Sequence, residues 1–406
     1  MSKYRSHKTT EPFLKQVRKH KKPYKTRVMG KEIIVYPNVM SPKYDYSSRF
    51  HIQNMPNQRG KSFLEIGCGC GVVSLFAHSQ GASMIVAVDI NLDAVENTKS
   101  NFEKHGVRNA QVFKSDVFEN VKGSYDTITF VAPYHNNKPK DILEYGVYDY
   151  NYHTLRSFVK DAKNYLNPGG QIILGFSDTG DNDTIKRLFI ENKLLLKDFK
   201  EGKIGSWNAY LYVLEPIRLK NSAQEFIYNN SYFWFKKHKL KTSKGRILQV
   251  GSGLGYLHYF IKLYNNDITS LDITRNKESL FPDEIKIYGG RKIPFKDNHF
   301  DVVIAPYTLH HEKDYRNLFR EIVRVSINDI MIIEEIYSNI ISRLYMVFNC
   351  WRINRKANQK VNILWDSYLN MKRLMGMIKD SRLKIKRVYT RKRGLFKEVS
   401  LVLKKH

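Results

Sequence analysis

The chain has 406 residues, 42% of them hydrophobic, and a formal net charge of +29. The length is more than one hydrophobic core usually needs, so we expect two domains, and the hydrophobic content excludes a globally disordered chain. No apolar run approaches the ~20 residues that a membrane-spanning helix requires. The N-terminus is polar and basic and shows no secretory signal.

The positive charge is densest near the two ends of the chain. It predicts either a polyanionic partner such as nucleic acid or a lysine-rich composition spread over solvated faces, and both readings stay open. The clustered residues are Lys15, Arg18, Lys19, Lys21, Lys22, Lys25 and Arg27, then Lys384, Lys386, Arg387, Arg391, Lys392 and Arg393.

The three cysteines are Cys68, Cys70 and Cys350. Their spacing to one another and to histidines does not indicate a zinc site, and we expect no metal. Two of them lie in a glycine turn, where a structural disulfide would be badly placed. We therefore expect a reducing, cytoplasmic location.

Residues 1–30 are basic and predict a loose arm or a short helix, followed by a strand over 32–36 and a proline-flanked loop over 37–44. An apolar strand over 63–66 then contains Glu65 and enters a turn with glycine at every second position: Gly67, Gly69 and Gly71. Glycines of this kind let the backbone approach a bound ligand closely.

The next apolar run ends at Asp89. In doubly wound folds an acid at this place binds ribose hydroxyls, so the turn and the acid together predict a nucleoside-binding site. Strands continue to alternate with helices, which predicts a parallel α/β sheet. The remaining predicted elements of this half are a helix over 92–105, a strand over 110–113 followed by Asp116, a strand over 125–131, a helix over 152–166, a strand over 171–176, a helix over 184–192 and a strand over 208–214.

The same order of elements occurs again in the second half of the chain. A strand enters the turn Gly251-Ser252-Gly253-Leu254-Gly255, and a second strand ends at Asp272. This repetition indicates two similar domains. The predicted helices are 222–239, 256–264, 315–325, 340–351 and 365–378, and the further strands are 285–288, 300–304, 330–334, 383–389 and 399–403.

We therefore predict an α/β protein with two tandem Rossmann-like, doubly wound domains and mainly parallel seven-stranded sheets. The predicted ranges are a basic arm over 1–30, a first domain over 31–216, a linker over 217–221 and a second domain over 222–406.

With these motifs, both halves resemble class I S-adenosylmethionine-dependent methyltransferases. The first half is similar to the small-domain group, which includes the release-factor glutamine and rRNA guanine-N2 methyltransferases. The resemblance implies that Glu65 holds the amino-acid end of S-adenosyl-L-methionine, that Asp89 binds its ribose and that Asp116 lies near its adenine. The matching residues are Val39-Met40-Ser41-Pro42, the turn Glu65 to Gly71 with Gly67 and Gly69, Asp89, Asp116, and Tyr125-Asp126 leading to Pro133-Tyr134.

The first half departs from that group at the acceptor end. The group carries Asn or Asp followed by Pro-Pro-Tyr or Pro-Pro-Phe, whereas this chain has Val131-Ala132-Pro133-Tyr134. Valine cannot accept a hydrogen bond from an amino group, which argues against glutamine or exocyclic-amine methylation. Tyr134 and His135 are the candidate catalytic residues here.

The second half resembles the type 11 group of small-molecule methyltransferases. Its implied cofactor residues are Gly251, Gly253, Gly255 and Asp272, and its candidate catalytic residues are His310 and His311. It departs at Gln249, where the group usually has an acid, and at Gly289-Gly290, near where an acid usually meets adenine.

The predicted function is S-adenosylmethionine-dependent methyl transfer to a small metabolite or natural product, at oxygen or nitrogen. The alternative is an RNA or protein methyltransferase in which one half is a docking module. A NAD-dependent dehydrogenase is disfavoured because the first turn is Gly-x-Gly-x-Gly and neither half offers a dehydrogenase-like catalytic set. One half could also be a non-catalytic scaffold.

Overall fold

The computed structural model describes residues 10–405. The first nine residues of the predicted basic arm lie outside this range. The chain divides into two compact units, 1–218 and 219–406, and this division falls within the predicted linker 217–221. Among the described residues, no helix is long and apolar enough to cross a membrane.

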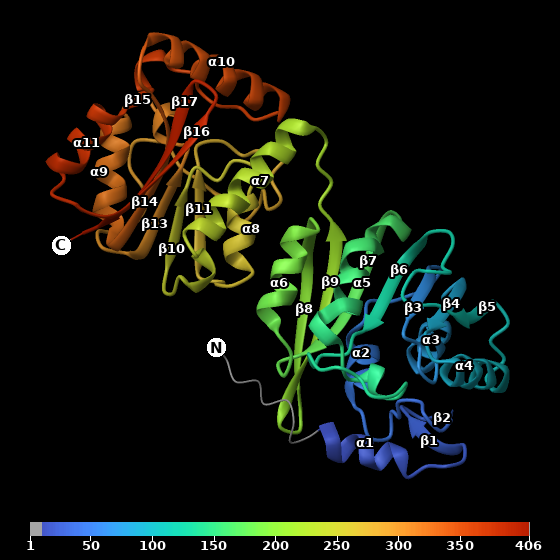
Figure 1. The fold of residues 1–406 in the computed structure, drawn as a ribbon. Coiled ribbons are helices and arrows are strands. Elements are labelled where there is room, and N and C mark those ends of the chain that lie inside the picture. The colour runs from blue at the N-terminus through green and yellow to red at the C-terminus, as the bar shows by residue number, and fades with distance from the viewer. Residues whose placement is uncertain (1–9, 406) are drawn as a thin grey trace. The chain divides into compact units, whose positions relative to one another are not determined.

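The first unit is built on a seven-stranded sheet of order β5-β4-β3-β6-β7-β9-β8 (Figure 1). Neighbours from β5 to β7 are parallel, and β9 and β8 add an antiparallel hairpin. The chain order reverses between β3 and β6, and ligands of doubly wound sheets bind beyond the carboxyl ends of the strands at such a point. The strands are β3 (Ser62–Ile66), β4 (Met84–Asp89), β5 (Ala110–Lys114), β6 (Tyr125–Val131), β7 (Leu166–Ser177), β8 (Leu194–Ile204) and β9 (Trp207–Pro216).

Helices cover both faces of this sheet, because its central strands are apolar on both sides. One core contains side chains of α5 and α6, and the other contains side chains of α2, α3 and α4. The helices are α2 (Ser47–Asn54), α3 (Val72–Ser79), α4 (Leu92–Lys104), α5 (His153–Asp161) and α6 (Asn182–Glu191). The predicted helix 152–166 is shorter than expected, since α5 ends at Asp161, residues Ala162–Tyr165 form a 3₁₀ turn and Leu166 begins β7.

Residues 10–35 are a folded part of the first unit. Helix α1 (Thr10–Arg18) buries Leu14 and Val17, and Arg18 pairs with Asp141 and Glu144. Strands β1 (Tyr24–Val28) and β2 (Lys31–Val35) form a separate antiparallel pair. The described part of the predicted arm is therefore not loose, because its apolar side chains have a core to enter.

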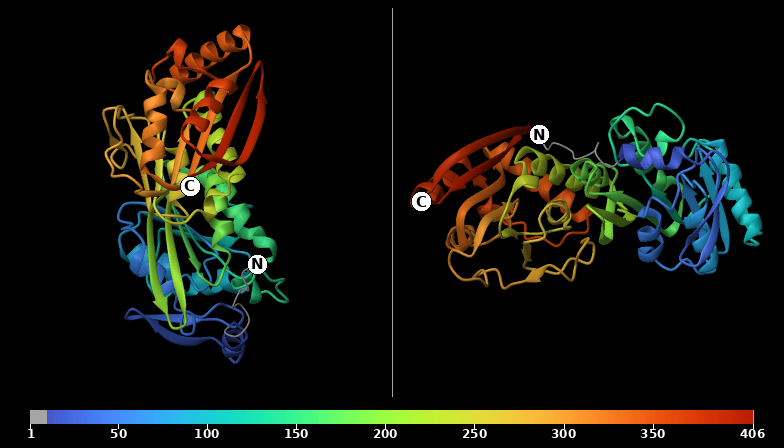
Figure 2. Two further views of the ribbon diagram at one scale, coloured as in Figure 1. Left: turned by 90° about the vertical axis from the view of Figure 1, so that its left-hand side faces the viewer. Right: turned by 90° about the horizontal axis from the view of Figure 1, so that it is seen from below.

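The second unit has an eight-stranded sheet of order β12-β11-β10-β13-β14-β17-β16, with β15 paired to β14 outside this path. The predicted number of strands is seven. The main path of the sheet has seven, and the two-residue strand β15 adds an eighth by pairing with the end of β14. Figure 2 shows the long hairpin β16–β17 at one edge. The strands are β10 (Ile247–Val250), β11 (Ile268–Asp272), β12 (Lys286–Ile287), β13 (Phe300–Pro306), β14 (Ser326–Tyr337), β15 (Leu369–Asn370), β16 (Lys384–Arg393) and β17 (Phe396–Lys404).

The helices of the second unit again lie on both sides of its sheet (Figure 1). Helices α9 and α11 contribute to the same core as β13 and β14. The aromatic residues of α7 pack mainly inward, with Tyr228 and Trp234 almost fully buried. The helices are α7 (Ser222–Lys237), α8 (Tyr256–Lys262), α9 (Tyr315–Val325), α10 (Ile340–Lys356) and α11 (Met371–Asp380).

Candidate functional site

The first unit has a pocket of about 1540 Å³, open to solvent, beyond the carboxyl ends of its central strands. Strands β3 and β6 are neighbours in the sheet, so the turns that follow them lie side by side. The fold thus brings most of the predicted site residues of this half together. Those that line the pocket are Glu65, Gly67, Gly69, Asp89, Asp116 and Tyr134.

The backbone of the turn after β3 is accessible from this pocket. Gly69 has a φ of +56°, and a Cβ added there would meet no atom within 4 Å. Its N–H donates to the Oδ2 atom of Asp89 over 2.9 Å. The turn and the acid are therefore joined at the place where a ligand could approach the backbone.

Gly71, also predicted to bind the cofactor, does not line the pocket with Gly67 and Gly69. It precedes the first residue of α3 with a φ of +74°, and a Cβ there would lie 2.7 Å from the Cγ2 atom of Thr98. The third glycine is thus required by the packing of the turn against α4.

Glu65 lines the pocket and is buried. Its Oε2 atom accepts hydrogen bonds from the backbone N–H and the hydroxyl of Ser74. Burial outweighs these bonds and raises the pKa of the Glu65 carboxyl to about 8. A cationic group placed beside it would favour the ionised form.

Two further acids of this pocket, Asp89 and Asp116, differ in burial. Asp89 accepts from the backbone N–H groups of Gly69 and Asn91, and burial raises its pKa. Asp116 follows β5 and is exposed. A carboxylate has about four lone-pair sites, so Asp89 can accept further hydrogen bonds from a ligand.

Val131, Ala132, Pro133 and Tyr134 line the pocket where β6 ends. Burial raises the pKa of the Tyr134 hydroxyl, and the nearby Asp45 carboxylate adds to this rise. Asp45 also lines the pocket, and burial raises the pKa of its carboxyl. Asp45 lies in the loop before α2, a helix that the sequence pattern did not predict.

His135, also predicted as a catalytic residue, is not among the residues that line the pocket. Its Nε2 atom lies 3.0 Å from the Oγ1 atom of Thr10 in α1, and the imidazole is buried. It differs from its neighbour Tyr134 because successive residues of an extended chain point in opposite directions. His153 lines the pocket instead.

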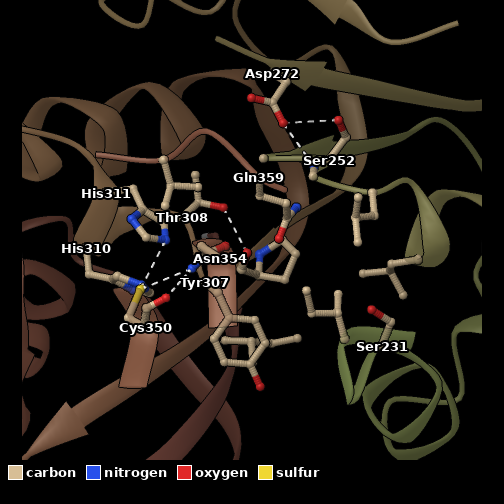
Figure 3. Close-up of a pocket in the computed structure, with 18 of the residues that line it drawn as sticks. Ser231, Ser252, Asp272, Tyr307, Thr308, His310, His311, Cys350, Asn354 and Gln359 are labelled. Carbon is tan, nitrogen blue, oxygen red and sulfur yellow. Dashed lines mark hydrogen bonds between the residues drawn. The ribbon is translucent and has the colours of Figure 1, made fainter. Parts of the chain in front are cut away.

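The second unit has a pocket of about 1300 Å³ at the corresponding place, shown in Figure 3. Asp272 lies at one end, and His310 and His311 lie at the other. The N–H of Gly253 donates to the Oδ2 atom of Asp272 over 2.9 Å. The turn and acid of the first unit are therefore repeated in the second, as the sequence predicts.

The glycine turn of the second unit is covered by side chains of the same unit. A Cβ at Gly251 would collide with the Thr308 hydroxyl, and one at Gly253 would lie 2.7 Å from the Nε2 atom of Gln359. Figure 3 shows Gln359 between Asp272 and the histidines. The space that is open above Gly69 is occupied above Gly253 by the amide end of the flexible Gln359 side chain.

Gly255, also predicted to bind the cofactor, does not line the second pocket with Gly251 and Gly253. A Cβ there would lie 2.8 Å from the Oγ atom of Ser279. Tyr288, next to the pair Gly289-Gly290, lines the pocket. Gln249, which stands where Glu65 stands in the first unit, is buried and donates to the carbonyl of Gly251.

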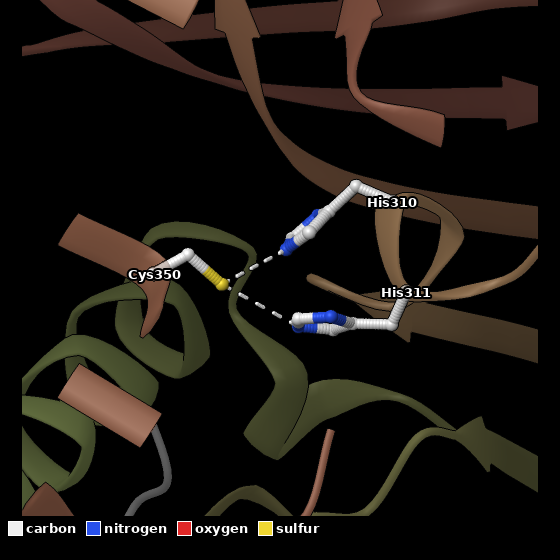
Figure 4. Close-up of side chains that lie close together, drawn as sticks. All are labelled: His310, His311 and Cys350. Carbon is white, nitrogen blue, oxygen red and sulfur yellow. Dashed lines mark hydrogen bonds between the residues drawn. The ribbon is translucent and has the colours of Figure 1, made fainter. Parts of the chain in front are cut away.

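His310 and His311 lie in a 3₁₀ turn after β13, and both face Cys350 of α10 (Figure 4). Burial alone would lower the pKa of His310, but Glu334 and Cys350 outweigh it, and the pKa is raised. Burial, with His310 as a smaller cause, lowers the pKa of His311 to about 3. The spacing of Cys350 did not suggest this contact, since 39 positions separate it from His311.

Two methyltransferase family models match the chain. The model described as "Methyltransferase small domain" matches residues 31–200, and the one described as "Methyltransferase domain" matches residues 248–331. A relative from Methanocaldococcus jannaschii, which carries the provisional name of a protein N5-glutamine methyltransferase, is 35% identical over 168 residues, covering 40% of this chain and 84% of the relative.

Two other relatives are longer than the region they share with this chain. Ribosomal RNA small subunit methyltransferase C of Chromohalobacter salexigens is 30% identical over 32% of this chain and 37% of its own length. The bifunctional methyltransferase of Rickettsia conorii is 26% identical over 49% of this chain and 43% of its own length. The chain thus spans less than half of either relative.

Among solved structures, a methyltransferase from Pyrococcus furiosus matches with a TM-score of 0.39 and 22% identity, over 47% of this chain and 91% of that one. The family models and the M. jannaschii relative agree with the motifs and the sheet order described above. The chain belongs to the class I S-adenosylmethionine-dependent methyltransferases.

Proposed function

We propose that the first unit is the half that binds S-adenosyl-L-methionine and transfers its methyl group, with the acceptor placed against residues 131–134. The observation that carries this proposal is the open space above Gly69, next to Asp89, whereas Gln359 fills the same space above Gly253. The second unit would then bind or dock the substrate, or it would catalyse a distinct step.

The residues of the first pocket fit the cofactor. Asp89 has lone pairs left for the ribose hydroxyls, and Glu65 has its Oε1 atom left for the amino-acid ammonium group. When bound, the cofactor supplies a methyl group activated by its sulfonium. The protein then contributes alignment of the acceptor and, where the acceptor needs it, a base.

Asp45 is our candidate for that base. Its side chain lies at the acceptor end beside Tyr134, and its raised pKa moves it toward the range in which a carboxylate accepts protons well. Tyr134 is unsuited to the role, because burial raises its pKa and keeps the hydroxyl protonated. Tyr134 would orient the acceptor instead.

The first candidate acceptor is a small planar molecule. The acceptor end is walled by apolar side chains, including Val131, Pro133 and Leu143. Val131 offers no hydrogen-bond acceptor to an amide or an exocyclic amine, so this wall favours apolar contact with a ring.

The second candidate acceptor is RNA, and the charge around the pocket favours it. Lys43, Lys138 and Lys140 are exposed on the loops that also supply lining residues, and Tyr145 is 47% exposed at the mouth. Exposed aromatic rings with nearby lysines suit stacking on an unpaired base and contact with phosphates. The name of one relative, ribosomal RNA small subunit methyltransferase C, adds weight to this candidate.

Calorimetric titration with S-adenosylhomocysteine tests which unit binds. Three matched variants place arginine at glycines of similar φ: Gly69→Arg at +56°, Gly253→Arg at +53° and, in an open hairpin turn, Gly205→Arg at +58°. We expect a stoichiometry near one that Gly69→Arg abolishes and Gly205→Arg preserves. Loss of binding in Gly253→Arg with binding intact in Gly69→Arg would overturn the proposal.

Transfer of a labelled methyl group tests the acceptor. The enzyme is incubated with labelled cofactor and a cell extract, which is then separated into small-molecule, RNA and protein fractions. Label in small molecules supports the first candidate. Label in RNA supports the second, and the triple change of Lys43, Lys138 and Lys140 to Glu should then reduce RNA binding and flatten its dependence on salt.

A further inference from the structure

The second unit contains a cluster of three potential metal ligands that come from separate elements. His310 and His311 lie in the 3₁₀ turn after β13, and Cys350 lies in α10. One potential ligand atom from each residue lies within 4.8 Å of the other two. Figure 4 shows both imidazole rings directed at the sulfur.

The distances are close to those of a tetrahedral site. The Sγ atom of Cys350 lies 3.8 Å from the Nε2 atom of His310 and 3.9 Å from that of His311. Zn²⁺ bonds of about 2.3 Å to sulfur and about 2.0–2.1 Å to nitrogen would place sulfur and nitrogen about 3.6 Å apart. A shift of a few tenths of an ångström is enough to close the site, as an estimate from those bond lengths.

The outer nitrogens of both histidines are held in the orientation that metal ligands have. The Nδ1 atom of His311 lies 2.7 Å from the Asn362 carbonyl, which can only accept, so this nitrogen carries the proton and Nε2 offers its lone pair. The Nδ1 atom of His310 lies 2.5 Å from Glu334. Hydrogen bonds to a carbonyl and a carboxylate are the usual second contacts of zinc-bound histidines.

Charge balance also suits a divalent cation. Glu334 is fully buried, and its Oε1 atom accepts from the backbone N–H groups of Thr308 and Leu309. A doubly charged ion with the Cys350 thiolate and the Glu334 carboxylate would give a neutral buried group. The Nδ2 atom of Asn354 donates to the sulfur over 3.3 Å.

We propose that His310, His311 and Cys350 bind a divalent cation of the zinc class. All three residues line the pocket of the second unit, so the fourth coordination position would face that pocket. Three protein ligands with one open position are typical of catalytic zinc sites. A thiol or hydroxyl compound entering the pocket could take the open position, and its proton would pass to solvent as it binds.

Cobalt binding tests the site, because Co²⁺ reports on both the thiolate ligand and the geometry. The full chain is treated with a chelator, titrated with Co²⁺ and followed by absorption. We expect one ion per chain, a sulfur-to-cobalt charge-transfer band, the visible bands of a tetrahedral ion and displacement by Zn²⁺. Absence of stoichiometric binding would overturn the proposal.

Matched variants assign the ligands. Cys350→Ser should remove the charge-transfer band, and His311→Gln, at a partly exposed position, should weaken cobalt binding at least tenfold. Cys70→Ser and His299→Gln replace a cysteine and a histidine outside the cluster and should leave the spectrum unchanged. Circular dichroism checks that each variant is folded. A charge-transfer band that persists in folded Cys350→Ser would show that the sulfur ligand lies elsewhere.

Discussion

At the scale of single residues, the two units differ most at one position of the first central strand. Glu65 in the first unit is a buried acid with a raised pKa, whereas Gln249 in the second cannot ionise. A cofactor with a cationic end would gain from the acid and not from the amide. This difference agrees with the open glycine turn in assigning the cofactor to the first unit in our proposal.

The raised pKa of Glu65 predicts that cofactor binding releases a proton. At pH 7 the carboxyl of the free protein is mostly protonated, since its pKa is about 8. Binding of a cation favours the ionised form, so affinity for S-adenosylhomocysteine should rise with pH up to about 8, by at most tenfold per pH unit, and then level off. Calorimetry at pH 7 in buffers of different ionisation enthalpy should detect up to one released proton.

Glu65→Gln should abolish this proton release, and Glu103→Gln, an exposed change at the end of α4, should not. Equal proton release in the wild type and in Glu65→Gln would contradict the role assigned to Glu65.

The candidate base Asp45 makes a second residue-scale prediction. Asp45→Asn keeps the size of the side chain but removes proton acceptance, and we expect kcat to fall about 10²–10⁴-fold for an acceptor that must lose a proton. The KM for the cofactor should change little, because Asp45 lies at the acceptor end. A kcat within twofold of the wild type, measured on the acceptor identified by labelling, would exclude Asp45 as the base.

At the scale of elements, α1 shows how a basic segment can be structural. Lys15 is exposed and Arg18 pairs with Asp141 and Glu144, while Leu14 and Val17 enter a small core with Leu143, Val147 and Tyr148. The last three residues belong to the segment that borders the acceptor end of the first pocket. We infer that α1 supports this segment.

Leu14→Ala should therefore destabilise the first unit by about 2–5 kcal/mol, the usual cost of removing a fully buried leucine side chain. Denaturant unfolding measures this change. The exposed neighbour Lys15→Ala should alter the free energy of unfolding by less than about 0.5 kcal/mol. A similarly small effect of Leu14→Ala would mean that α1 does not contribute to the core.

At the scale of the whole molecule, the chain consists of two units that each have their own cores and their own pocket. Units built in this way can respond separately to a ligand, because binding stabilises only the unit that binds.

Calorimetric thermal unfolding of the full chain should show two transitions. S-adenosylhomocysteine at about 100 times its Kd should stabilise one of them by about 2.7 kcal/mol and leave the other in place. Gly69→Arg should remove that shift. Equal shifts of both transitions would instead indicate two working cofactor sites.

The sequence by itself determined the repeated α/β order, the two glycine turns and the acids that follow them. These features are local: a strand, a turn that needs positive φ and a strand-ending acid can each be read from neighbouring residues. Hence Gly69 with Asp89 and Gly253 with Asp272 meet as predicted. The polar and partly exposed strand β8 and the short helix α2 lacked a clear periodic pattern and were missed.

Only the tertiary structure decided which candidates share a pocket. His135 faces α1, the third glycine of each turn packs against a neighbouring segment, and Cys350 meets two histidines from a separate element. The side chain of Gln359 likewise lies against Gly253 in the second glycine turn, although Gln359 belongs to no recognisable sequence motif. Such contacts depend on how elements distant in sequence pack together, and no local pattern of residues encodes them.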